Sequence, residues 1–224
     1  CVIDSPLSQI ADLSLELPWA FDHSVCQTST VTNLYTANLM LFAFLANDEL
    51  LLSDIGKAIQ EGEAYMNRVE GPIRQAVSGE WSNVLILADG ELKGLAAEGA
   101  IALTEIAQVH AQSHHLLDVR HGPIVTVNKD TLVIAILSPE GKDYQEKLMR
   151  DIKAQGATII TFTDHLSPGI HGIVDLEVVF GTPLDIAAQG IPFIFIPQLI
   201  AIVSAERQGI QPDQPSGLSA WVKL

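Results

Sequence analysis

Four short apolar runs in the second two-thirds of the chain predict the strands of a buried sheet. Residues 84–88, 131–137 and 157–162 are almost continuously apolar and rich in β-branched side chains, as expected of strands covered on both faces. Residues 174–179 alternate more between apolar and polar positions. This alternation favours a place nearer the edge of the sheet.

Helical patterns separate these runs. Residues 92–115 are rich in Ala, Leu and Glu, residues 143–154 are amphipathic, and residues 183–206 are mostly apolar. The last stretch is expected to be irregular around Pro192 and Pro197, because proline cannot donate a helical hydrogen bond. Strands that alternate with helices predict an α/β fold, here a doubly wound parallel sheet flanked by helices.

The first third of the chain has a different pattern. Its elements are expected, in order, as a strand end at 1–3, a turn at 4–7 that enters a short helix, an edge strand at 13–17, a polar loop at 22–32 and helices at 34–47 and 52–76. We interpret residues 1–78 as the C-terminal part of one α/β unit with a linking helix. Residues 79–224 are then one complete second unit.

The composition of the chain indicates which binding partners and which cellular compartment are expected. Hydrophobic residues make up 48% of the chain and charged residues 17%, which predicts a sizeable core and no extended disorder. The net charge of −15 disfavours binding to nucleic acid or to anionic membranes. The uninterrupted apolar runs are too short to span a membrane. Two cysteines, Cys1 and Cys26, make no disulfide framework and fit a reducing cytoplasm.

Glu98 and Glu105 are candidates for acid–base chemistry. They lie seven residues apart, which places them on one helix face about two turns apart. Moving a proton between adjacent carbons through an enediol requires one carboxylate near both carbons, and partial burial makes a carboxylate a stronger base. The residues alone leave open that both glutamates are solvated surface groups.

Two histidine-containing segments invite comparison. His121 lies in a Gly-Pro turn, where a rigidly held imidazole can transfer protons between oxygen atoms. On the predicted helix, His110 and His114 would share a face next to His115, as in some zinc sites. No carboxylate or cysteine completes that set at a zinc-like spacing, so no metal is predicted.

A glycine-containing turn follows the first predicted strand. Residues 90–94, with glycine at both ends, could cradle an anion at the start of a helix. The spacing of a dinucleotide fingerprint is missing. No cofactor is therefore predicted.

Several stretches, in one consistent order, resemble the SIS (sugar isomerase) family. They are the helix Glu98–Ile106 (EGAIALTEI), the loop Arg120–Pro123 (RHGP) and the tail Gln211–Leu218 (QPDQPSGL), and residues 22–32 look like a degenerate copy of the loop that ends the family's first SIS unit. The separation of 16 residues between Glu105 and His121 also agrees with the family's spacing of this glutamate and histidine. The similarity is to the double-SIS branch that contains the isomerase half of glucosamine-6-phosphate synthase.

This resemblance implies an activity and roles for individual residues. It implies a phosphosugar isomerase that interconverts an aldose and a ketose through an enediol, with or without deamination. Glu105 would be the base that moves the C1–C2 proton. His121 would open the sugar ring, from a loop that in the family often reaches the site of a neighbouring subunit. The resemblance implies that the sugar phosphate contacts Val25, Gln27 and Glu98. Arg120, beside His121, could help to hold the phosphate, or it could be an ordinary surface arginine.

Some positions depart from the family pattern. Ala102 and Ala220 stand where the synthase branch has lysines, and Gln27 replaces a serine. The phosphate loop of the family belongs to its first SIS unit, upstream of Cys1, so a longer parent protein is expected to carry it. A SIS module that binds or senses a sugar phosphate without turnover is the alternative function, and a dimerisation half without a site is a third.

A homodimer is expected from the apolar helices. Residues 34–46 and 197–203 carry more apolar surface than one small domain needs to bury. An exposed patch of this kind usually marks an interface between subunits.

Overall fold

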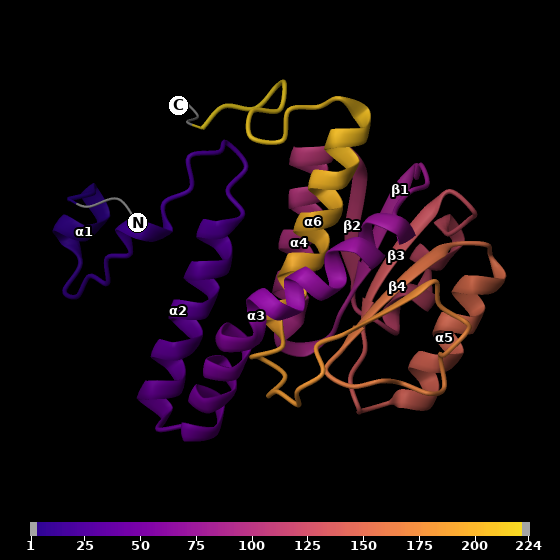
Figure 1. Ribbon diagram of the computed structural model, residues 1–224, viewed down its shortest axis with the longest axis horizontal. Helices are drawn as coiled ribbons and strands as arrows, with labels where there is room; N and C mark the ends of the chain where they lie inside the picture. Colours follow the sequence, from indigo (N-terminus) through magenta and orange to yellow (C-terminus); the bar gives the residue numbers. More distant parts are fainter. Residues whose placement is uncertain (1–3, 221–224) are drawn as a thin grey trace.

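The computed structural model describes residues 4–220, and its centre is a five-stranded parallel sheet (Figure 1). The strand order is β2-β1-β3-β4-β5. The strands are β1 (Asn83–Leu87), β2 (His110–His114), β3 (Thr131–Ile136), β4 (Thr158–Thr163) and β5 (Leu176–Val179). The four predicted strands are confirmed, and β5 lies at an edge as its alternation indicated. The strand end expected at residues 1–3 lies outside the described residues.

The described residues also form six α-helices and four short 3-10 turns. The α-helices are α1 (Pro6–Ile10), α2 (Ser29–Ala46), α3 (Glu49–Ala76), α4 (Lys93–Ala107), α5 (Lys142–Ala154) and α6 (Gly190–Gln208). The 3-10 turns are η1 (Pro18–Ala20), η2 (Gly90–Leu92), η3 (Asp118–His121) and η4 (Pro123–Thr126). Figure 1 shows α2 and α3 beside the sheet layers, with α1 at the far end of the molecule.

Alternate side chains of the strands enter two separate cores. Ile86 and Ile134 are fully buried in the cluster that includes α3, α4 and α6. Their neighbours Leu85 and Val133 are buried in the cluster beneath α5. Because successive side chains of a strand point to opposite faces, helices cover both faces of this sheet. The predicted doubly wound α/β fold is confirmed.

Helix α6 is the central helix of the larger core. It is long and apolar enough to cross a membrane, but 72% of that stretch is buried inside the protein. Its Pro197 lies so close to α4 that a Cβ on Gly99 would be 2.8 Å from the proline ring. The helix begins at Gly190, later than the predicted residue 183, and Pro192 falls in its first turn, where the missing N–H would have no helical partner.

The predicted helix 92–115 is wrong in its last third. Helix α4 ends at Ala107, where Gln108 adopts a left-handed conformation with φ 54°. Residues 110–114 then form β2, an edge strand without an apolar run. Its sequence, HAQSH, has no apolar run to predict a strand, because an edge strand of this kind buries few apolar side chains. The three histidines therefore do not share a helix face.

Two other expectations also differ from the structure. Residues 13–17 form no strand, and residues 13–16 are exposed. Residues 197–203 are largely buried in the core of the chain, so they offer no surface to a second subunit. The apolar face of α2 is different, because Phe42, Phe44 and Leu45 remain 64%, 71% and 65% exposed.

Candidate active site

Helix α4 brings Glu98 and Glu105 to one side of the larger core. The helix starts after the carboxyl end of β1 and ends before the amino end of β2, so Glu105 lies toward the amino ends of the strands. Both glutamates are partly buried. Burial, together with the charge of Glu105, raises the pKa of Glu98 to about 7. One carboxylate oxygen of Glu98, Oε2, is buried without a hydrogen-bond partner among the described residues.

Glu105 is open to solvent on one side. It lines a hollow of about 520 Å³ between α4 and the edge strand β2, together with Ile101, Thr104 and His114. A small polar molecule in this hollow could reach the carboxylate. A partly buried carboxylate beside an open hollow is the arrangement that a general base requires.

On its other side Glu105 meets the loop that precedes α2. The buried side chain of Cys26, which is 4% exposed, lies near the Glu105 carboxylate. Burial and the nearby carboxylate raise the pKa of Cys26 to about 11. The thiol therefore stays protonated across the physiological range and can act as a donor.

The C-terminal tail closes over the same region. The backbone N–H of Val25 donates to the carbonyl oxygen of Asp213 at 2.9 Å. The side chain of Gln108, just after α4, donates to the carbonyl oxygen of Ser216 at 3.2 Å. The three segments that carry the family resemblance at residues 22–32, 98–106 and 211–218 are thus brought together by the fold.

The predicted substrate-binding residues of the loop have different exposure. Val25 is half-buried and held by its backbone to the tail, whereas Gln27 is exposed and donates to the Asp22 carbonyl oxygen at 3.2 Å. Ala102 is buried on α4 between the two glutamates in sequence, and Ala220 is exposed. Neither alanine can supply the cation that the family pattern has there.

His121 and Arg120 lie on the other side of the sheet. Both belong to η3, whose Val119 is buried in the core beneath α5. His121 is exposed, and Gly122 after it has φ 145°, a conformation that favours glycine. Arg120 donates to Asp151 of α5 at 2.6 Å. Within one chain, the fold therefore separates His121 and Arg120 from Glu105 by the thickness of the sheet.

The histidines of β2 bond along the strand. Gln112 bridges them, at 2.7 Å to His110 and 3.3 Å to His114. His115 faces Asp89 at 3.2 Å. In the described residues 4–220, no group of three or more His, Cys, Asp or Glu side chains could hold a metal ion.

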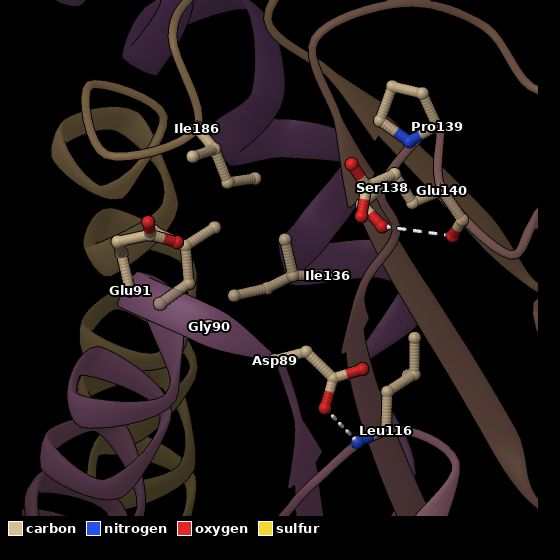
Figure 2. A pocket seen from close by; sticks show the side chains of 10 residues that line it. Asp89, Gly90, Glu91, Leu116, Ile136, Ser138, Pro139, Glu140 and Ile186 are labelled. Carbon is tan, nitrogen blue, oxygen red and sulfur yellow. Dashed lines mark hydrogen bonds between the residues drawn. The ribbon is translucent and has the colours of Figure 1, made fainter.

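A separate cavity of about 310 Å³ lies at the carboxyl ends of β1 and β3. The strand order reverses between these two strands, which is the usual ligand position in open α/β sheets. Figure 2 shows Glu91 on one side, Ser138 and Glu140 on the other, and Ile136 and Ile186 between them. The segment predicted as an anion cradle, residues 90–94, forms part of this wall.

The charge of this cavity disfavours an anion. Asp89, Glu91 and Glu140 are all exposed around it. Asp89 already accepts hydrogen bonds from the backbone N–H of Leu116 at 3.0 Å and from His115. Three carboxylates at one rim repel a phosphate group, although a helix N-terminus alone would attract it.

The sequence carried no specific signal for two residues of the loop that precedes α2, near Glu105. Cys26 was noted only for its redox state, and Asp22 only as part of a polar loop. Asp22 accepts hydrogen bonds from the backbone N–H groups of Thr28 and Ser29, at the start of α2. The six-residue spacing matches no capping box, so only the polar character of the loop pointed to it.

Comparison with known proteins supports the resemblance to the SIS family. The SIS domain model matches residues 80–170. The chain is 28% identical over 200 residues to the D-galactosamine-6-phosphate deaminase AgaS of Shewanella sp. (strain ANA-3), covering 87% of this chain and 47% of that protein. It is 27% identical over 225 residues to the glutamine–fructose-6-phosphate aminotransferase (isomerizing) of Sulfurisphaera tokodaii, covering 100% and 37%.

Solved structures show the same fold. The C-terminal domain of glucosamine-fructose-6-phosphate aminotransferase from Francisella tularensis aligns with a TM-score of 0.78 and 19% identity, over 96% of this chain and 64% of that one. The glucosamine-6-phosphate deaminase from Thermotoga maritima aligns with a TM-score of 0.77 and 20% identity, over 98% and 64%.

The α/β fold of this chain is that of these solved structures. Residues 80–170 match the SIS domain model, and the resemblance to the SIS family seen in the motifs is confirmed. It spans less than half the length of the two curated relatives compared above.

Proposed function

We propose that the intact protein is a phosphosugar isomerase, which moves a proton between C1 and C2 of a sugar or amino-sugar phosphate through an enediol. The observation that carries this proposal is the position of Glu105, a partly buried carboxylate that lines an open hollow and is closed on its other side by the 22–28 loop. Both curated relatives act on hexose phosphates, according to their names.

Glu105 is the base in this proposal. It takes the proton from one carbon of the open-chain sugar phosphate and returns it to the neighbouring carbon. Glu98 binds the substrate two turns away on the same helix, where its unpartnered carboxylate oxygen offers a hydrogen-bond site. When the substrate carries an amine at C2, the same proton transfer gives an imine at C2, which water hydrolyses to a ketone and ammonia.

His121 opens the sugar ring from a neighbouring subunit. It is exposed on η3, on the face of the sheet away from Glu105 of its own chain. A homodimer that joins one subunit's η3 to the other's α4 would complete the site. Val25, Gln27 and Arg120 remain proposed substrate contacts, although Arg120 must first leave its ion pair with Asp151.

Other parts of the proposal concern the rest of the protein. We assign residues 1–78 to the end of a first SIS unit, whose sheet would cover the exposed apolar face of α2. Residues 79–224 form the second unit. The two cysteines and the relatives' metabolic roles favour a cytoplasmic enzyme.

Solvent deuterium exchange at C2 of sugar phosphates tests the proposal in the full-length protein. Glu105→Gln keeps the shape and hydrogen bonding of the side chain but removes its basicity, so exchange should fall by roughly 10²–10⁴ while ligand affinity changes little. His121→Asn should slow the reaction of a cyclic sugar more than that of an open-chain substrate.

Two outcomes would overturn this assignment. Unchanged exchange in Glu105→Gln would place the base elsewhere. A wild-type protein that binds sugar phosphates but exchanges none of them would be a sensor, the function that Ala102 and Ala220 favour.

A further inference from the structure

We propose that Gln108 is a positioning residue, whose side chain holds the C-terminal tail beside the proposed base, Glu105. This inference rests on the proposed function, because it concerns the surroundings of the same base. It assigns a task to a side chain that lies just beyond the helix segment 98–106 and outside every stretch that resembles the family.

The tail is attached to two elements that flank Glu105. The carbonyl oxygen of Asp213 accepts a hydrogen bond from the backbone N–H of Val25 at 2.9 Å. The carbonyl oxygen of Ser216 accepts one from the side-chain amide of Gln108 at 3.2 Å. Val25 belongs to the loop before α2, and Gln108 follows Glu105 by three residues at the end of α4. The tail therefore links the loop and the helix on either side of the base.

The backbone of Gln108 is held in place from two directions. Gln108 has a left-handed conformation with φ 54°, and its N–H donates to the carbonyl oxygen of Leu103 within α4. The carbonyl oxygen of Ala107, just before it, accepts from the Gln208 side chain of α6 at 3.1 Å. Because the ends of the two helices are joined here, the Gln108 side chain reaches the tail from a fixed position.

The tail between its two attachments has a defined shape. Pro215 is buried, although Gln214 and Ser216 beside it are exposed. The N–H of Gln214 donates to the carbonyl oxygen of Gln211 at 3.3 Å, and that of Leu218 to Pro215 at 3.4 Å. Loss of one attachment of such a short folded segment should loosen the other. A segment held beside a base can orient the substrate relative to that base.

Three variants of the full-length protein test the attachment. Gln108→Met keeps the length of the side chain and removes its donor, and Gln108→Lys restores a donor. Gln208→Met is the control, because the Gln208 side chain donates to carbonyl oxygens at the same helix ends, those of Ala107 and Ser204.

Hydrogen exchange of the Val25 amide reports the contact with the tail. In Gln108→Met its protection should fall by roughly 3–10-fold, as expected for the loss of one hydrogen bond. Protection should recover in Gln108→Lys and stay unchanged in Gln208→Met.

The C2 exchange reaction measures the effect on the site. In Gln108→Met the KM for the sugar phosphate should rise by roughly 3–10-fold, while kcat changes by less than about twofold. The pH–rate profile should stay in place, because the base itself is unchanged.

The outcomes separate this inference from the proposed function. Unchanged protection of Val25 in Gln108→Met would show that Gln108 does not hold the tail. An equal loss of protection in Gln208→Met would assign the effect to the helix ends, and the role would again be wrong. If protection falls but KM does not change, the tail takes no part in orienting the substrate. If Glu105→Gln retains exchange, the proposed function fails, and the Val25 amide still decides whether Gln108 holds the tail.

Discussion

Carboxylates lie at both ends of the strands of the parallel sheet, but their surroundings differ. We call the side where the strands begin the amino edge and the side where they end the carboxyl edge. At the amino edge, Glu98 and Glu105 are partly buried on α4 beneath a loop and the C-terminal tail. At the carboxyl edge, Asp89, Glu91 and Glu140 are exposed around an open cavity (Figure 2). The difference teaches that burial, more than residue type, decides which carboxylate can serve as a base.

The comparison also reverses a general expectation. Open α/β sheets bind ligands at the carboxyl ends of their strands, where the strand order reverses. In this chain that place is acidic and unsuited to phosphate, while three of the four segments with family resemblance gather near the amino ends of the strands. In the proposed function, residues 79–224 therefore contribute a helix and a tail to the site, and the place where the strand order reverses is not part of it.

The largest expected difference between carboxylates at the two ends of the strands is in their effect on the rate of proton transfer. Glu105→Gln should reduce C2 exchange by roughly 10²–10⁴, whereas Glu91→Gln, at the carboxyl edge, should leave it within about twofold because the side chain is solvated. The same exchange assay on full-length protein measures both. A large loss in Glu91→Gln would show that the acidic cavity takes part in the reaction.

The second prediction compares the stability effects of substitutions at two glycines of α4, one packed against α6 and one in open space. In Gly99→Ala, the new Cβ would be 2.8 Å from Pro197 and 3.1 Å from Ile86, so unfolding free energy should fall by about 1–3 kcal/mol. Gly94→Ala places its Cβ in open space and should raise stability by about 0.5–1 kcal/mol. Urea unfolding measures both. Equal effects would mean that the contact between α4 and α6 is loose.

The third prediction uses the raised pKa of Glu98. The folded protein favours neutral Glu98, so the stability associated with this group is full below its ordinary value of 4.5 and is lost as pH rises through about 7. Because the side chain is partly exposed, the loss should be only ~1–3 kcal/mol. Thermal unfolding from about pH 5 to pH 8 should show this decline in wild type and not in Glu98→Gln. Parallel curves would contradict the shift.

The smallest effect concerns the loop at the amino edge. Burial opposes the charge of Asp22, but hydrogen bonds from Ser24, Thr28 and Ser29 outweigh it and lower the pKa of Asp22 to about 2. Its stabilising effect is therefore present above 3.8 and lost as pH falls through about 2. Asp22→Asn should cost about 1 kcal/mol near neutral pH, as loss of a cap does. Hydrogen exchange of the Thr28 and Ser29 amides would report it; unchanged protection would argue against the capping role.

The apolar pattern of the sequence determined most of the fold. The three continuous runs became β1, β3 and β4 because strands buried on both faces must be apolar throughout. Amphipathic α5 followed from its 3.6-residue period. The pattern failed for β2, because an edge strand that buries little needs no apolar run, and for residues 13–17, which alternate but have no strand beside them in the described chain.

Only the tertiary structure decided the surroundings of the site. The sequence by itself placed Glu98 and Glu105 on one helix face, because a seven-residue spacing is two turns. It could not show that Cys26 meets Glu105, that Asp213 meets Val25, or that His121 lies across the sheet from both, since these pairs are far apart in the chain. Such contacts depend on how helices pack and where loops are held, and a local pattern of residues carries no information about them.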